Sequence, residues 1–337
     1  MTEANESRVT AVTSAVVTEP LTDPIPSAPP RSQWVDVWHQ FRRHRGALAG
    51  LVVFVTILLV VFIGPFIYPQ DAKYVPTGRE FLNLKDMRPA YVLLWDADAK
   101  ADWAHPLGTD NIGRDTLARL MQGGQVSITV GLAAMLLSLV LGTFVGVTAG
   151  YFRKLDGPLM RVTDLFLALP LLPLLLVTVL LFREPLKVAF GVEGGIFVLI
   201  VFIVGVTSWM QTARIVRGDV LALKEREFVL AAQSIGTRNS KMVVRHILPN
   251  VLSPIMVSAT LGIATAIITE SALSFLGFGF PPDFPTWGRL LNDAVDRMTF
   301  FPERAIWPGV LISVTVLSVN YMGDGLRDAL DPRIRGR

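Results

Sequence analysis

Residues 125–150 read QVSITVGLAAMLLSLVLGTFVGVTAG, and this stretch decides the fold class. It contains no Asp, Glu, Lys, Arg or His, and it exceeds the roughly 20 residues that a helix needs to cross a hydrocarbon layer of about 30 Å. A transmembrane β-strand needs only about 10 residues. In lipid, each backbone donor and acceptor must be satisfied within the protein, and a helix does this within one segment. The stretch therefore predicts a membrane-spanning α-helix.

Five further stretches have the length and apolar composition of membrane spans. They are residues 47–68, 159–182, 195–213, 251–276 and 304–323. Of the 337 residues, 51% are apolar and only 18% are charged, against about 25% charged residues in an average soluble domain. We expect an all-α integral membrane protein with six transmembrane helices, embedded in a lipid bilayer. This composition excludes disordered, collagen-like and nucleic-acid-binding proteins.

The distribution of positive charge predicts the orientation of the spans, because Lys and Arg accumulate in cytoplasmic loops. With the N-terminus in the cytoplasm, the inner segments carry 19 Lys and Arg residues and the outer segments carry 12. Seven of the outer charges lie in the long segment 69–124, and long translocated loops largely ignore the rule. We expect both termini in the cytoplasm and residues 69–124 as an extracytoplasmic loop.

The two ends of the chain differ from its apolar body. Residues 1–33 are rich in Pro, Ser and Thr, and they predict a disordered cytoplasmic tail. Residues 34–46 predict an amphipathic helix at the membrane interface. Its apolar side chains recur at i, i+3, i+4 and i+7 and are Trp34, Val37, Trp38 and Phe41. We expect residues 329–337 to form a short cytoplasmic tail.

Signatures of catalysis and of nucleotide binding are missing from the sequence. There is no cysteine, and the four histidines have no metal-ligand spacing. The nearest match to a phosphate-binding loop is Gly108–Asp115, GTDNIGRD, which ends in Arg and Asp where Lys and Ser or Thr are required. We expect no enzymatic activity, no metal site and no cofactor on this chain.

Two features inside the spans predict how the helices pack and bend. Gly142, Gly146 and Gly150 form two overlapping GxxxG repeats, which allow another helix to approach closely. Pro170 and Pro173 predict a bend in the third span, because each frees a backbone carbonyl.

Glu270 is the ionisable residue that lies clearly within a span. Membrane carboxylates often line transport paths, so Glu270 is a candidate for the substrate path. The alternative is a structural hydrogen bond to a neighbouring helix or to Ser271 or Ser274. The sequence leaves both alternatives open.

The cytoplasmic loop 214–250 contains a short amphipathic helix within EREFVLAAQSIG, residues 225–236. Gly236 is suited to the left-handed conformation that ends a helix. Such a helix fits a groove on a cytoplasmic partner; the alternative is a helix that only lies on lipid. We expect the docking surface to consist of Phe228, Ala231, Ala232, Ile235 and Gly236, flanked by Glu225 and Glu227.

Four blocks of sequence identify a family. They are residues 105–131, HPLGTDNIGRDTLARLMQGGQVSITVG; 227–250, EFVLAAQSIGTRNSKMVVRHILPN; 270–288, ESALSFLGFGFPPDFPTWG; and 323–333, GDGLRDALDPR. In this order they resemble the C-type permease subunit of the dipeptide and oligopeptide ABC importers, the peptide/nickel permease family. The resemblance covers about residues 35–335.

The resemblance implies a type I ABC importer permease fold, with a five-helix core at residues 125–328 and one extra N-terminal span. It implies that residues 227–250 are the EAA loop, which engages an ATPase. Leu230 stands where the general EAA pattern has its Glu, which leaves any salt bridge at that position in doubt.

The resemblance also implies the partners: a second, non-identical permease subunit, two ATPase subunits that bind ATP and Mg, and an external solute-binding protein. The 69–124 loop is then a candidate for contacting the binding protein. The expected cargo is a di- or oligopeptide. Alternatives are nickel or another small solute in the same importer class, or an ion-coupled secondary transporter or a membrane-anchored assembly factor.

Overall fold

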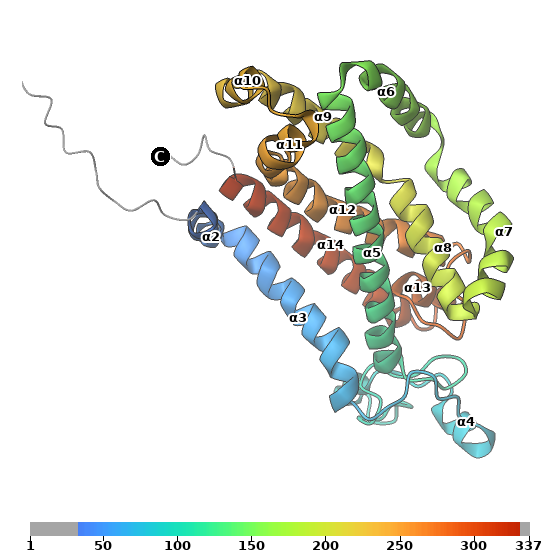
Figure 1. Cartoon of the computed structure of the whole chain (residues 1–337). Helices are drawn as coiled ribbons and strands as arrows, with labels where there is room; N and C mark the ends of the chain where they lie inside the picture. Colours follow the sequence, from blue (N-terminus) through green and yellow to red (C-terminus); the bar gives the residue numbers. More distant parts are fainter. Residues whose placement is uncertain (1–32, 331–337) are drawn as a thin grey trace, which may run out of the picture. The chain divides into compact units, whose positions relative to one another are not determined.

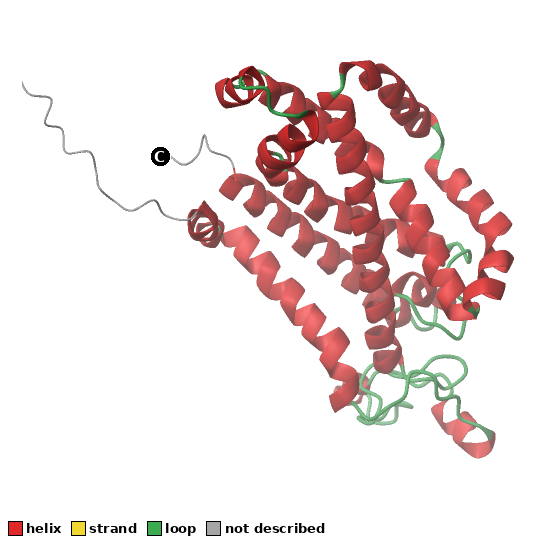
Figure 2. Cartoon of the chain, in the orientation of Figure 1, coloured by secondary structure: helices red, strands yellow, loops and turns green. Residues whose placement is uncertain are grey.

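The computed structural model describes residues 33–330. Apart from Gln33, Ala329 and Leu330, the tails predicted at 1–33 and 329–337 lie outside the described residues. The described chain is almost entirely helical and contains no β-strand (Figures 1 and 2). The residues from Val37 onward form one compact unit, and the contacts below lie within it. The expected all-α fold is confirmed.

The helices follow one another with short connections, except for the long segment between α4 and α5. In chain order they are α2 Gln33–Arg43, α3 Arg45–Ile67, α4 Gly78–Leu84, α5 Thr116–Tyr151, α6 Arg153–Ala168, α7 Leu171–Phe190, α8 Val192–Val206, α9 Trp209–Lys224, α10 Glu227–Ser234, α11 Asn239–Met242, α12 Leu252–Phe275, α13 Trp287–Val295 and α14 Glu303–Leu330. A π-helical turn, Val243–Ile247, and a 3₁₀ turn, Leu248–Asn250, connect α11 to the region before α12. A further 3₁₀ turn, Ala90–Leu94, lies in the segment before α5.

By length and composition, five of the described helical segments can cross a membrane: α3, α5, the α8–α9 pair, α12 and α14. The pair of α6 and α7 makes a sixth if it is counted as one span, but its two helices are bent by 90°. The third span, expected at 159–182 with a bend at its prolines, is thus divided into two helices. Helix α6 ends at Ala168, two residues before Pro170, because the residue before a proline is disfavoured in the α conformation.

Helix α9 continues further than the sequence indicates. The fourth span was expected at 195–213, but α9 extends to Lys224. The first part of segment 214–250 is therefore helical and belongs to α9 instead of a loop.

Helix α5 contains 36 residues and is about 54 Å long at 1.5 Å per residue. It begins at Thr116, well before the predicted start of the span at residue 125, because the Asp115 carboxylate accepts a hydrogen bond from the Ala118 N–H at 2.7 Å. An aspartate in this position caps a helix by satisfying one of its free N–H groups. The helix is longer than the hydrocarbon layer is thick, so it reaches into the aqueous phase.

The three glycines of the GxxxG repeats face α9. A Cβ atom at Gly142 would lie 2.7 Å from the Trp209 carbonyl oxygen, and one at Gly146 would lie 2.6 Å from the Ala213 carbonyl oxygen. A Cβ atom at Gly150 would lie 2.7 Å from Cβ of Val220. These distances are shorter than real carbon contacts, so α5 and α9 approach this closely only because the glycines lack side chains.

The N-terminal helices pack against the end of α14. Val37 and Phe41 of α2 are buried in a cluster with Ala47 of α3 and Ala329 of α14, and Trp38 is half exposed. The apolar face predicted for residues 34–46 thus contacts protein; the side chain of Trp34 lies outside the described part. Helix α3 also approaches α14 at Gly50, where a Cβ atom would lie 2.7 Å from the Ser318 carbonyl oxygen.

We expect Gly146→Ala to destabilise the protein by about 1–3 kcal/mol, because the added methyl group forces α5 away from the α9 backbone. Gly218→Ala is the matched control, since a Cβ atom at Gly218 of α9 meets nothing within 4 Å. Thermal unfolding of the purified protein in detergent measures both effects. Equal unfolding temperatures for the two variants would contradict the close α5–α9 contact.

Candidate functional site

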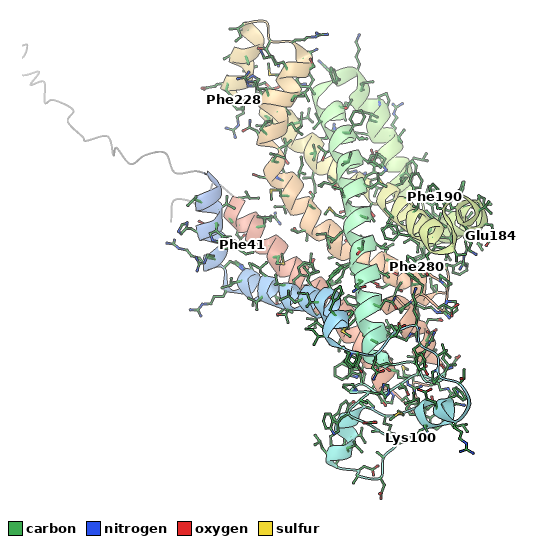
Figure 3. All side chains as sticks on the ribbon, turned by 60° about the horizontal axis from the view of Figure 1, so that its bottom comes forward. Phe41, Lys100, Glu184, Phe190, Phe228 and Phe280 are labelled. Carbon is green, nitrogen blue, oxygen red and sulfur yellow. The ribbon has the colours of Figure 1, made fainter. Side chains whose placement is uncertain are left out.

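Helix α10 presents apolar side chains to solvent at one end of the molecule. Phe228 is 44% exposed and Ile235 is 83% exposed, and Ala231 is exposed between them. Figure 3 shows Phe228 at the opposite end from Lys100, which lies in the segment before α5. An exposed apolar face on a short, well-anchored helix is a surface suited to a partner groove.

The predicted docking stripe is divided between two faces of α10. Ala232 is buried together with Val229, in a core cluster that includes Val220 of α9 and Met242 of α11. The assignment of Ala232 to an outward docking face is therefore corrected: it attaches α10 to its own chain. Leu230 is 45% exposed and joins the outward set. Glu225 and Glu227 are exposed beside it.

Gly236 ends α10 in the left-handed conformation that the sequence predicts, with φ of +78°. Its N–H donates to the Gln233 carbonyl at 2.9 Å, and the Thr237 N–H donates to the Ala232 carbonyl at 3.2 Å. This pair of bonds is the Schellman arrangement, which satisfies the last carbonyls of a helix. The chain therefore leaves α10 at a fixed angle.

Polar contacts connect α9 and α11 to the end of α5, and α9 to α6. The Lys224 ammonium donates to the Tyr151 carbonyl at 3.0 Å, where a cation is favourable near the C-terminus of a helix. The Tyr151 hydroxyl donates to Oδ1 of Asn239 at 3.0 Å. Arg217 of α9 forms two hydrogen bonds to Asp156 of α6, one of 2.8 Å from Nη2. Two-point contacts of this kind fix orientation as well as distance.

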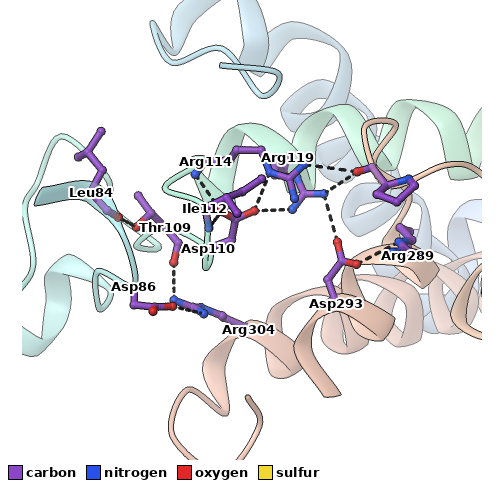
Figure 4. Close-up of polar contacts among 11 residues, drawn as sticks. Leu84, Asp86, Thr109, Asp110, Ile112, Arg114, Arg119, Arg289, Asp293 and Arg304 are labelled. Carbon is purple, nitrogen blue, oxygen red and sulfur yellow. Dashed lines mark hydrogen bonds and ion pairs between the residues drawn. The ribbon is translucent and has the colours of Figure 1, made fainter. Parts of the chain in front are cut away.

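At the other end of the molecule, a network of charges connects the segment before α5 to α13 and α14 (Figure 4). Asp86 accepts hydrogen bonds from Arg297 at 3.0 Å and from Arg304 at 2.9 Å. Arg304 also donates to the Thr109 carbonyl at 2.6 Å. The Thr109 hydroxyl donates in turn to the Leu84 carbonyl. Residues more than 200 positions apart in sequence are thereby held together.

The second half of the network centres on Arg119, whose side chain is buried. Its guanidinium pairs with Asp110 at 2.8 Å and with Asp293 of α13 at 3.3 Å. Arg114 also pairs with Asp110, at 2.7 Å, and Arg289 pairs with Asp293 at 3.0 Å. Buried charges are tolerated when each has partners, and here Asp110 and Asp293 each pair with two arginines.

Asp115 connects this network to the end of the first span. Besides capping α5, it accepts hydrogen bonds from the Tyr68 hydroxyl at 2.8 Å and from Nδ1 of His105 at 2.7 Å. The sequence excluded GTDNIGRD as a phosphate loop but did not show what it does instead. The structure places Thr109, Asp110 and Arg114 in the network and Asp115 in this cap.

Glu270 of α12 is fully buried. Its carboxylate accepts a hydrogen bond from the Ser274 hydroxyl at 2.7 Å and lies 3.5 Å from the Ser271 hydroxyl. The buried hydroxyls of Ser127 and Thr286 also lie close to it. This arrangement corresponds to the structural alternative that the sequence left open.

Two of these hydroxyl groups also accept hydrogen bonds from backbone N–H groups. The Ser127 oxygen accepts from the Trp287 N–H at 3.3 Å, and the Thr286 oxygen accepts from the Arg289 N–H at 3.1 Å and caps α13. Glu270 therefore lies where α12 meets α5 and the start of α13.

The sequence matches two family models in succession. Residues 122–336 match the binding-protein-dependent transport system inner membrane component. Residues 32–84 match the N-terminal TM domain of oligopeptide transport permease C.

The chain belongs to the binding-protein-dependent transport permeases.

Three curated relatives match nearly the whole length of this permease. It is 36% identical to the oligopeptide transport system permease protein OppC of Bacillus subtilis, covering 90% of this chain and 91% of the relative. It is 33% identical to the dipeptide transport system permease protein DppC of Alkalihalophilus pseudofirmus, over 94% and 98%. It is 34% identical to the glutathione transport system permease protein GsiD of Pectobacterium atrosepticum, over 90% and 93%. These relatives are permease proteins, and the permease is accordingly a multi-pass membrane protein and not an enzyme.

A solved structure supports the fold. A chain of the MetNI methionine ABC transporter in inward-facing conformations aligns with a TM-score of 0.51 at 17% identity, over 63% of this permease and 97% of that chain. The expected type I importer permease fold, with an additional N-terminal membrane domain, is therefore confirmed.

We expect Glu270→Gln to leave the permease folded, because the amide retains an oxygen acceptor for Ser274 and its N–H groups find hydroxyl oxygens. Glu270→Leu leaves the hydroxyls without a buried acceptor and should destabilise the protein by about 1–3 kcal/mol. Thermal unfolding in detergent and the amount of protein in the membrane measure the difference. If Glu270→Gln folded normally but abolished transport, Glu270 would belong to the substrate path.

Proposed function

We propose that this permease is one membrane subunit of an ATP-driven importer that moves di- or oligopeptides across the plasma membrane of a prokaryotic cell. The relatives named for oligopeptide, dipeptide and glutathione transport support this cargo class. The observation that carries the proposal is α10, an exposed apolar helix fixed to the ends of two long membrane helices.

The partners of α10 are two ATPase subunits, which hold ATP and Mg. Phe228, Ala231 and Ile235 insert into a groove of the ATPase, while Val229 and Ala232 keep α10 on its own core. An inward and an outward apolar face on one short helix suit a connector between two bodies. Burial of the exposed face contributes about 25 cal/mol per Å² of apolar surface.

Movement of α10 reaches the membrane through α9. Because α9 is continuous from Trp209 to Lys224 and lies directly on the glycines of α5, a displacement of its cytoplasmic end moves the pair together. Packed helices respond in discrete rigid-body shifts. ATP-driven closure of the ATPase subunits thereby changes the opening of the translocation path.

A second, non-identical permease subunit completes the path, and an external solute-binding protein delivers the cargo. The segment before α5 faces away from α10 and is held rigidly by the Asp86 and Arg119 contacts. These properties support it as the binding-protein contact. In this orientation both termini lie in the cytoplasm, as the distribution of Lys and Arg favours.

We expect Ala231→Asp to abolish peptide uptake by the reconstituted importer while the permease still inserts and assembles in the membrane, because the new charge would be buried without a partner in the ATPase groove. Ala231→Ser is the matched control and should retain uptake, since it is small and uncharged. Uptake of radiolabelled peptide into proteoliposomes containing ATP measures both. Normal uptake with Ala231→Asp would refute the coupling role.

The same uptake assay tests the left-handed turn at Gly236, where the chain leaves α10. Gly236→Pro should also abolish uptake, because proline fixes φ near −65° whereas Gly236 has a φ of +78°. An uncoupler that collapses ion gradients should leave wild-type uptake unchanged. Uptake that stops with the uncoupler and continues without ATP would instead indicate an ion-coupled secondary transporter.

A further inference from the structure

Two interruptions of the membrane helices meet at one cavity. The first lies between α6 and α7, where Leu169 and Leu171 line the cavity, and the second lies between α8 and α9, where Thr207 and Ser208 line it. The cavity has a volume of about 260 Å³, which is enough for several water molecules. Irregular backbone at membrane depth is tolerated where it is buried in protein or lines a water-filled cavity.

The cavity wall is mostly apolar, and its polar groups are uncharged. Its lining has no Asp, Glu, Lys, Arg or His. Six hydroxyl groups and the Gln211 amide supply donors and acceptors, and leucines and two methionines supply the apolar part. Glu270 is not among the lining residues, so the cavity is separate from the carboxylate that the sequence singled out.

One hydroxyl on the wall has no partner. Ser258 of α12 is 9% exposed, and its oxygen is buried without a hydrogen bond within the described residues. Burying an unpaired hydroxyl is unfavourable because its hydrogen bonds to water are lost. Rotation of the Ser258 side chain toward a polar ligand or water in the cavity would recover that energy. Ser138 of α5 lies on the same wall and is also buried.

Both apolar and polar residues of the lining reach the protein surface. Leu169 and Leu171, at the first helix break, and Leu261 of α12 are each about 40% exposed. Gln211 of α9 and Thr265 of α12 are exposed as well. This mixture suits a molecule with neutral polar groups along its length and variable side groups.

We propose that this cavity contacts the main chain of the peptide cargo during its passage, with the Ser258 hydroxyl as a hydrogen-bonding partner of a peptide amide. The inference rests on the proposed function and adds the contact site and its chemistry. Peptide N–H and C=O groups are neutral and occur in every peptide, whatever its side chains. A wall with hydroxyls and without charge therefore holds many sequences without favouring one.

The chain has no cysteine, so Ser258→Cys introduces a single thiol into this subunit with little change of volume. The variant is assembled with its partner subunits in proteoliposomes and treated with a charged, membrane-impermeant methanethiosulfonate. Phe144→Cys is the matched control, because Phe144 is 70% exposed on another face of α5. We expect the Ser258→Cys thiol to react about tenfold faster than the Phe144→Cys thiol, since only a thiol in contact with water ionises and reacts.

The second measurement adds an equimolar pool of tri- to pentapeptides together with the binding protein and ATP. Labelling of the Ser258→Cys variant should slow at least threefold during turnover, while labelling of the Phe144→Cys control stays unchanged. Failure of the thiol at position 258 to react, or reaction that peptides do not slow, overturns the proposal. Ser138→Cys provides the same test if Ser258→Cys does not assemble.

Uptake and thiol protection, measured together, distinguish rejection of the contact site from rejection of the importer function. Peptide uptake by the wild-type complex, with no protection of the thiol in the Ser258→Cys variant, rejects the cavity as a contact site and leaves the peptide importer intact. Absence of peptide uptake by the wild-type complex rejects the importer function, and with it the assigned ligand.

Discussion

The close contact between α5 and α9 is the constraint on which the rest of the structure depends. Gly142, Gly146 and Gly150 contribute no side chain from α5, so α9 lies directly against the α5 backbone along several turns. Lipid provides no hydrophobic driving force for helix association, and close van der Waals packing must supply it. This contact fixes the position of Lys224 and, beyond it, of α10.

Helix α5 connects the two ends of the permease. Its first turn is capped by Asp115 beside the outer charge network, and its last residue, Tyr151, contacts Lys224 and Asn239 on the α10 side. Because one uninterrupted helix of 36 residues spans both regions, a shift imposed at either end is carried along a rigid body. The helix breaks between α6 and α7 and between α8 and α9 border the cavity, as does α5. Non-helical backbone therefore lies at the site proposed to contact the cargo.

The sequence predicts the features that depend on local pattern. Apolar length predicts the spans, and a glycine after a short amphipathic helix predicts the left-handed end at Gly236. Features that depend on distant partners leave no such signal. The pairing of Arg119 with Asp293 joins residues 174 positions apart, and nothing near either residue indicates the other.

The inward position of Ala232 could not be predicted either, because both faces of the short α10 helix carry apolar side chains and periodicity alone cannot say which face is covered. At Pro170 the sequence indicates a bend, but the angle of 90° depends on how α6 and α7 pack on their neighbours.

The most direct test of the coupling role is a crosslink from α10 to an ATPase subunit. Ile235→Cys places one thiol at the most exposed apolar position of that helix region in a chain that otherwise has none. In inverted membrane vesicles, a short bifunctional thiol reagent should join this thiol to the co-purifying ATPase, and in intact cells an impermeant thiol reagent should fail to reach it. Labelling of the Ile235→Cys variant from outside intact cells, with no crosslink to an ATPase, would contradict the account.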